Sequence, residues 1–237
     1  MTAEETRGDD SAAAAPGRNH LVRVTVERSD PAAQAVFVVP AAEPMVVLDV
    51  LLALQRHGDP SLVFRFSCRA GRCGTCTVRL NGTAVLACQT AVAGGAELVV
   101  EPLGGFPVVR DLVVDMAPFL DSWREVVRTM GPGATAETAP EAIDQRLLDS
   151  SRECIACGAC YAACPVAASD REFLGPATLA RAAGAYAPQT AGRSTVLGLR
   201  GFAGCHSVGA CSVVCPRQLD PASLIRSLRR GRWGRST

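Results

Sequence analysis

Eleven of the 237 residues are cysteine, and they fall into groups whose spacing is suited to binding metal. The densest run, residues 154–165, reads Cys-Ile-Ala-Cys-Gly-Ala-Cys-Tyr-Ala-Ala-Cys-Pro. This spacing is typical of sequences that bind two iron–sulfur clusters, in which three cysteines hold one cluster and the fourth holds the other. The run therefore predicts a second cysteine group downstream. Cys205, Cys211 and Cys215, the last followed by Pro216, supply it.

An earlier group has a different spacing. Its members are Cys68, Cys73, Cys76 and Cys88. Four and two residues separate the first three, which is the arrangement that binds a [2Fe–2S] cluster. We expect Gly71 and Gly74 to let the loop fold closely and to direct backbone N–H groups at the cluster sulfurs. The alternative is a zinc site or a set of free core cysteines, but zinc usually takes closely spaced cysteine pairs.

The interleaving of the two later groups predicts two further clusters. A [4Fe–4S] cluster would take Cys154, Cys157, Cys160 and Cys215, and the last cluster would take Cys164, Cys205 and Cys211. A symmetric run would place a fourth ligand at position 208, which is a valine. Because an aliphatic side chain cannot bind iron, we expect a [3Fe–4S] cluster there. The alternative is that an external ligand completes a four-iron cluster.

Composition supports metal ligation and argues against several other classes of protein. The net charge of +1 argues against a nucleic-acid partner. Residues 1–18 have no apolar segment of the kind a signal peptide needs, and clustered cysteines in a reducing compartment act as metal ligands. An odd number of cysteines would also leave a disulfide framework incomplete. Since no apolar stretch reaches 18 residues, we expect no membrane span.

The elements that would position the first cysteine group form a compact α+β pattern. Residues 1–19 are predicted to be a disordered tail. Periodicity and turn residues predict strands at 21–26, 34–39, 77–80, 83–86 and 97–101, and a helix over 44–56 that His57 and Gly58 end. Asn81-Gly82 is a strong hairpin sequence between two of these strands.

The second half is predicted to be helical. Apolar spacing indicates helices at 111–130, 142–151, 176–185 and 221–230. We place the domain boundary near residue 115, so that residues 20–115 form a [2Fe–2S] domain and residues 116–237 form an all-α domain with the other two clusters.

The chain shows no motif for a reaction of its own. No G-x-G-x-x-G sequence opens a helix, no P-loop is present, and the three histidines are far apart in the sequence. We find no constellation for acid–base or nucleophilic catalysis. The clusters are therefore expected to carry electrons between a donor and an acceptor held by other subunits.

The sequence resembles the iron–sulfur subunit of succinate dehydrogenase and fumarate reductase. The similarity extends from residue 21 to about residue 230. The residues that carry it are Ser67–Cys76, Asn81-Gly82, Leu86–Cys88, the segment Phe-Pro-Val-Val-Arg-Asp-Leu-Val-Val-Asp-Met at 106–116, and the segments 154–165, 174–177 and 205–216.

The resemblance implies an N-terminal β-grasp ferredoxin domain and a C-terminal helical ferredoxin domain. It also implies a flavoprotein partner that holds FAD and the dicarboxylate site, and a membrane anchor, in many members with haem b. Electrons would pass from FAD through the [2Fe–2S], [4Fe–4S] and [3Fe–4S] clusters to a quinone, or in reverse for fumarate reduction. The chain would then lie at the cytoplasmic face of the membrane as a peripheral subunit.

The resemblance also implies three residues near the quinone. Pro165 matches the proline after the first cysteine of the three-iron cluster, His206 matches a histidine of the dehydrogenase branch, and Arg229 falls where a basic residue lies near the quinone. His206 could instead be a structural, hydrogen-bonding histidine. The tryptophan of ubiquinone-linked members is absent near Ser169, which favours a menaquinone-type acceptor.

Two other functions fit parts of the pattern. One is a stand-alone multi-cluster ferredoxin that carries electrons between soluble partners, although the segment at 106–116 favours the membrane-bound complex. The other is a related complex in which the helical domain serves a thiol–disulfide site. Such proteins usually carry further Cys-Cys-Gly repeats, and this chain ends about 20 residues after Cys215.

Overall fold

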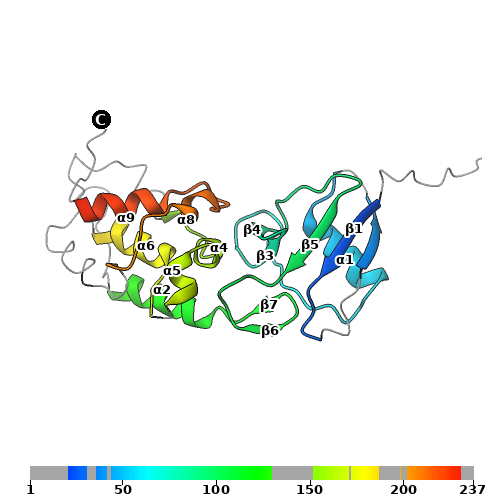
Figure 1. Cartoon of the computed structure of the whole chain (residues 1–237), viewed down its shortest axis with the longest axis horizontal. Coiled ribbons are helices and arrows are strands. Elements are labelled where there is room, and N and C mark those ends of the chain that lie inside the picture. The colour runs from blue at the N-terminus through cyan, green and yellow to red at the C-terminus, as the bar shows by residue number, and fades with distance from the viewer. Residues whose placement is uncertain are drawn as a thin grey trace, which may run out of the picture.

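The computed structural model describes residues 21–30, 36–41, 44–129, 152–170, 172–186, 198 and 202–230. The predicted tail at 1–19 and the predicted helix at 142–151 lie outside these residues. Figure 1 shows a strand-rich part built from the first half of the chain and a helical part built from the second half, with a small hairpin between them.

The strand-rich part is a five-stranded mixed sheet with one helix packed on it. Its strands are β1 (Leu21–Val26), β2 (Val36–Pro40), β3 (Thr77–Leu80), β4 (Thr83–Leu86) and β5 (Glu97–Glu101). They lie in the order β2-β1-β5-β3-β4. The central pair β1 and β5 is parallel and the other pairs are antiparallel. This is a β-grasp arrangement, and the predicted α+β class is confirmed.

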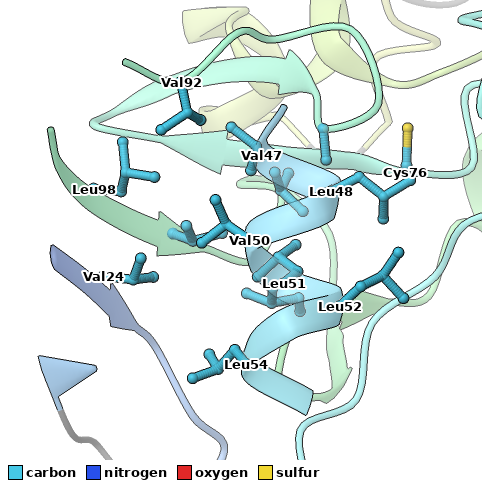
Figure 2. Close-up of a cluster of buried hydrophobic side chains, with 14 of the residues drawn as sticks. Val24, Val47, Leu48, Val50, Leu51, Leu52, Leu54, Cys76, Val92 and Leu98 are labelled. Atoms are coloured by element: carbon cyan, nitrogen blue, oxygen red, sulfur yellow. The ribbon is translucent and has the colours of Figure 1, made fainter. Parts of the chain in front are cut away.

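Helix α1 (Val47–His57) is held against the sheet by an apolar face. Val24 of β1 and Leu98 of β5 pair across the sheet and are buried beneath it. Figure 2 shows Leu51, Leu54 and other α1 side chains pointing into this core, with Cys76 at its edge. The helix begins three residues later than the sequence predicts. The Asp49 carboxylate accepts the N–H of Val46, and this bond fixes the first turn.

The segment after residue 107 differs from the prediction. The prediction of a helix from residue 111 is wrong for residues 111–116. There β6 (Val108–Arg110) and β7 (Val113–Val114) form a hairpin before α2 (Ala117–Thr129) begins. Asp111 turns the chain with a φ of 49°. Its buried carboxylate accepts the N–H groups of Ser29 and Val63. These distant partners stabilise a turn that helical periodicity alone does not reveal.

The helical part packs around its two longest helices after α2. These are α6 (Pro176–Tyr186) and α9 (Pro221–Arg230), which contact each other, and α2 also contacts α6. The predicted helices at 176–185 and 221–230 are confirmed. Three short helices were not predicted: α4 (Ala159–Ala162), α5 (Pro165–Ser169) and α8 (Ala210–Val213). No described helix is long and apolar enough to cross a membrane.

The two parts are joined by packed side chains as well as by the chain. Cys157 and Ala159 are buried in the same core cluster as the β-grasp residues, and Ile155 packs against it. Nearby, three aromatic rings pack together. The Phe106 ring centroid lies 5.9 Å from that of Phe119 and 5.1 Å from that of Tyr161, and Phe119 and Tyr161 are 5.7 Å apart. The cysteine loop of the helical part is therefore fixed directly on the β-grasp domain.

Candidate metal centres

The loop between α1 and β3 carries Cys68, Cys73 and Cys76 of the first group, and Cys88 follows β4. The Cys68 sulfur accepts the N–H groups of Ala70 and Arg72, at 3.4 and 3.3 Å. Cys68 is exposed, whereas Cys76 and Cys88 are buried. Such N–H donors stabilise thiolate charge, which is what iron ligation requires.

The thiols of this group influence one another's pKa values, so they lie close together. Burial raises the pKa of the Cys76 thiol to about 12, and the negative charge of Cys88 and Cys73 adds to the effect. Burial also acts to raise the pKa of Cys73, but hydrogen bonds from Thr75 and from the backbone lower it to about 6. A bound positive iron core would favour the Cys76 thiolate and so offset both its burial and the charge of the neighbouring thiols.

The second group surrounds one cavity. Cys154, Cys157, Cys160 and Cys215 all line it, which are the four cysteines that the sequence assigns to the [4Fe–4S] cluster. The rest of the lining is mostly apolar, with Arg181 and Arg217 as its charged members. Burial and the neighbouring thiols raise the pKa of Cys160 well above its usual value. A mostly apolar cavity lined by four cysteines fits a cluster of this kind.

The two later cysteine segments have the same backbone design. Residues 154–165 and 205–216 align without a gap, and each contains a non-glycine residue with positive φ, Ala156 at 50° and Ser207 at 58°. Two residues further on, Gly158 and Gly209 open α4 and α8 with φ values of 79° and 87°. The two short helices contact each other. In this alignment Val208 occupies the position of Cys157.

The third group lines a second cavity, together with that valine. Cys164, Cys205 and Cys211 contribute to its wall, as do Val208 and His206. Val208 is 67% exposed, so its place at the missing corner is open to solvent. Three thiols and one aliphatic side chain fit a cluster with three irons.

No three of the described Cys, His, Asp and Glu side chains converge closely enough for a single metal ion. An iron–sulfur core is larger than one ion and holds its ligands further apart, so the fit here rests on the shared cavities and on the thiol interactions described above. Among the described residues, the cysteines of the second and third groups line two cavities, and thiols of the first group interact with one another. Their assignment as cluster ligands stays a prediction.

The three candidates for the quinone end do not share one environment. Pro165 and His206 are both exposed and line the cavity of the third group. Arg229 is instead directed at the backbone. Its guanidinium donates to the carbonyls of Cys205 and Phe202, each at 2.5 Å, and to that of Ala203 at 2.9 Å. It also lies over the Phe202 ring. In this structure Arg229 fastens the loop that carries Cys205.

Sequence reasoning missed a second support of the cluster loops. The Asp220 carboxylate accepts the Ser223 N–H at the start of α9 and the Ser212 hydroxyl of α8. The Ser212 oxygen in turn accepts the N–H of Ala222. Burial acts to raise the pKa of Asp220, but these hydrogen bonds and Arg226 hold it below its usual range. The Asp-Pro sequence before a helix indicates a cap, but nothing in it reveals the link to α8.

Comparisons with known proteins agree with this architecture. Residues 20–121 match the model of a 2Fe-2S iron-sulfur cluster binding domain, and residues 150–219 match that of a 4Fe-4S dicluster domain. The fumarate reductase iron-sulfur subunit of Mycobacterium tuberculosis is 39% identical, with 84% of this chain and 85% of the relative covered. A mitochondrial succinate dehydrogenase [ubiquinone] iron-sulfur subunit of Oryza sativa is 33% identical, with 94% and 78% covered.

A solved structure supports the fold. A chain of the Mycobacterium smegmatis Sdh1 complex superposes with a TM-score of 0.74 at 24% identity, over 90% of this chain and 95% of that one. With the cysteine groups, the two domain matches and the two relatives taken together, this chain belongs to the family of fumarate reductase and succinate dehydrogenase iron–sulfur subunits.

Proposed function

We propose that this chain is the electron-transfer subunit of a succinate:quinone oxidoreductase or quinol:fumarate reductase. Electrons would pass between the FAD of a flavoprotein subunit and a membrane quinone, through [2Fe–2S], [4Fe–4S] and [3Fe–4S] clusters in that order. The observation that carries the proposal is the arrangement of three cysteine groups that adjoin one another from the β-grasp loop to the cavity beside Pro165.

The contacts between the groups support a continuous path. Gly74 of the first loop touches Cys157 of the second group, and the thiol of Cys160 is influenced by that of Cys211 in the third. When bound, each cluster supplies a site that gains and loses one electron. The protein's part is to supply thiolates, to exclude water and to direct N–H groups at the sulfurs, which tunes the reduction potential.

The partners follow from the two ends of this path. The flavoprotein would meet the β-grasp end, where Cys68 is exposed. A membrane anchor, with or without haem b, would meet the third group, where Pro165 and His206 are exposed beside the cluster cavity. The chain would then be held peripherally at the cytoplasmic face of the membrane. A menaquinone-type acceptor is favoured because the sequence around Ser169 lacks the tryptophan that the resemblance implies for ubiquinone-linked members.

Purification of the intact complex tests the proposal. We expect a flavoprotein to copurify, and the complex to couple succinate oxidation to quinone reduction, or quinol oxidation to fumarate reduction. Extraction of the bound quinone would identify the acceptor. A chain that purifies with its clusters but without a flavoprotein would contradict the proposal and favour a stand-alone multi-cluster electron carrier.

A further inference from the structure

The loops of the first and second cysteine groups touch backbone to backbone at one glycine. Gly74 lies between Cys73 and Cys76 of the first group, and it faces Cys157 of the second. A β-carbon added to Gly74 would lie 2.7 Å from the Cys157 β-carbon, 2.8 Å from its α-carbon and 3.0 Å from the Ile155 carbonyl oxygen. The first two distances are shorter than real β-carbon contacts and the third is tight, so no larger residue fits without moving a loop.

Both sides of this contact are fixed. The Gly74 carbonyl accepts the Thr77 hydroxyl at 2.7 Å and the Thr77 N–H at 3.3 Å. On the other side, Cys157 is 9% exposed and belongs to the core cluster of the β-grasp domain. Because neither loop can relax alone, a larger residue at position 74 would have to separate the two loops.

We propose that Gly74 sets the distance between the first and the middle cluster, and is thereby a positioning residue for electron transfer between them. The inference rests on the proposed function. The step itself moves one electron from the reduced first cluster to the oxidised middle cluster, or back, and no atom or proton is exchanged. Since Cys157 is a proposed ligand of the middle cluster and Gly74 is next to Cys73, the contact joins the two ligand loops directly.

A glycine outside the cysteine loops provides a control. Gly95 has a φ of 80°, in the same left-handed region as the 70° of Gly74, so alanine is strained at both positions. A β-carbon at Gly95 would meet nothing within 4 Å, and the residue lies in the turn before β5. Gly95→Ala therefore introduces backbone strain without separating the two loops.

The experiment compares Gly74→Ala and Gly95→Ala in the intact complex. Both clusters are reduced with titanium(III) citrate, and the EPR signal of the first cluster is recorded at low temperature. In the unmodified complex and in Gly95→Ala, the nearby reduced middle cluster should broaden this signal and speed its relaxation. In Gly74→Ala the broadening should be weaker at unchanged iron content, and quinone reduction by succinate should slow.

An unchanged broadening in Gly74→Ala, or an equal loss in both variants, would overturn the inference. If Gly74→Ala fails to assemble, the unmodified complex still provides a test. Relaxation of the first cluster should quicken when a potential step adds the electron to the middle cluster, and no change would overturn the inference. Failure of the proposed function is distinguishable, because the unmodified complex would then lack succinate–quinone activity.

Discussion

Val208 is the residue at which two otherwise matching cysteine segments differ. It stands where the first segment has Cys157, and it lies in the wall of the cavity that Cys164, Cys205 and Cys211 also line. Val208→Cys should therefore supply the missing thiolate and convert the three-iron cluster into a four-iron cluster. EPR of the oxidised complex should show a weakened or absent three-iron signal.

Val213→Cys is the matched control for this change. Val213 belongs to the neighbouring short helix and is 90% exposed, but it does not line the cavity of the third group. A new cysteine there should leave the three-iron signal intact. An intact signal in Val208→Cys would show that position 208 does not face the cluster.

Arg229 lies near the end of α9, and substitutions there test whether this residue serves the cluster loop or the quinone. Arg229→Gln removes charged hydrogen bonds to the Cys205 loop, which should cost about 2 kcal/mol in the free energy of unfolding. We expect less three-iron signal and an unchanged KM for quinone. Arg226→Gln is the control, since Arg226 donates to Ser223 on its own helix.

Arg229→Lys should restore only part of the cluster signal, because an ammonium group does not reproduce a planar fork that reaches three carbonyls. A raised KM for quinone with a full three-iron signal would place Arg229 at the quinone, as the family resemblance implies. The sequence alone could not reveal the bonds to the Cys205 loop, since the carbonyl partners lie more than 20 positions earlier in the chain.

At the scale of elements, Asp220 links α8 to α9 through Ser212. Asp220→Ala removes the cap of α9 and should lower the free energy of unfolding by about 1–2 kcal/mol. Because α8 carries Cys211 and leads to Cys215, we expect faster loss of iron to a chelator, measured by the decay of cluster absorbance. Asp220→Asn keeps an acceptor for the Ser223 N–H, so its rate of iron loss should lie between those of the wild type and Asp220→Ala. Equal iron loss in all three proteins would contradict the link.

Most elements could be predicted from local pattern, and the exceptions have physical causes. Strand alternation, the Asn81-Gly82 turn and the apolar faces of α6 and α9 are local signals, and they predicted elements that the structure contains. The prediction of helix from residue 111 is wrong over β7, because the turn before this strand depends on Asp111 binding Ser29 and Val63. Helices of four residues such as α4 are too short to show a period.

The candidate site, like the fold, could be predicted from the sequence only in part. The grouping of the cysteines could be predicted because ligand spacing is written in the sequence. Contacts between loops could not, since Gly74 against Cys157 and Arg229 against Cys205 join segments far apart in the chain.

At the scale of the whole molecule, a buried ion pair ties the hairpin between the two parts to the β-grasp domain. Arg28 and Asp111 are each about 5% exposed or less, and the Arg28 Nε lies 3.1 Å from the Asp111 carboxylate. Arg28 also pairs with Asp59. Asp111→Asn leaves Arg28 with one acid fewer in a buried site, so it should cost about 3 kcal/mol in the free energy of unfolding.

The cost of Asp111→Asn should depend on pH. Burial acts to raise the pKa of Asp111, but hydrogen bonds from Ser29, Val63 and Arg28 hold it below its usual value. The stabilisation is therefore present above the pKa of an unfolded aspartate and is lost as the pH falls through the lower, folded value. The difference in Tm between wild type and variant should be largest at pH 7 and should become smaller as the pH is lowered. A constant difference would contradict the assignment.

The central claim is that this chain holds three clusters in series, the last with three irons. EPR of the intact complex tests it most directly. The oxidised complex should show the signal of a three-iron cluster, and the dithionite-reduced complex should show that of a [2Fe–2S] cluster. An oxidised complex without a three-iron signal would contradict the assignment of Cys164, Cys205 and Cys211, with Val208 at the open corner, to a [3Fe–4S] cluster.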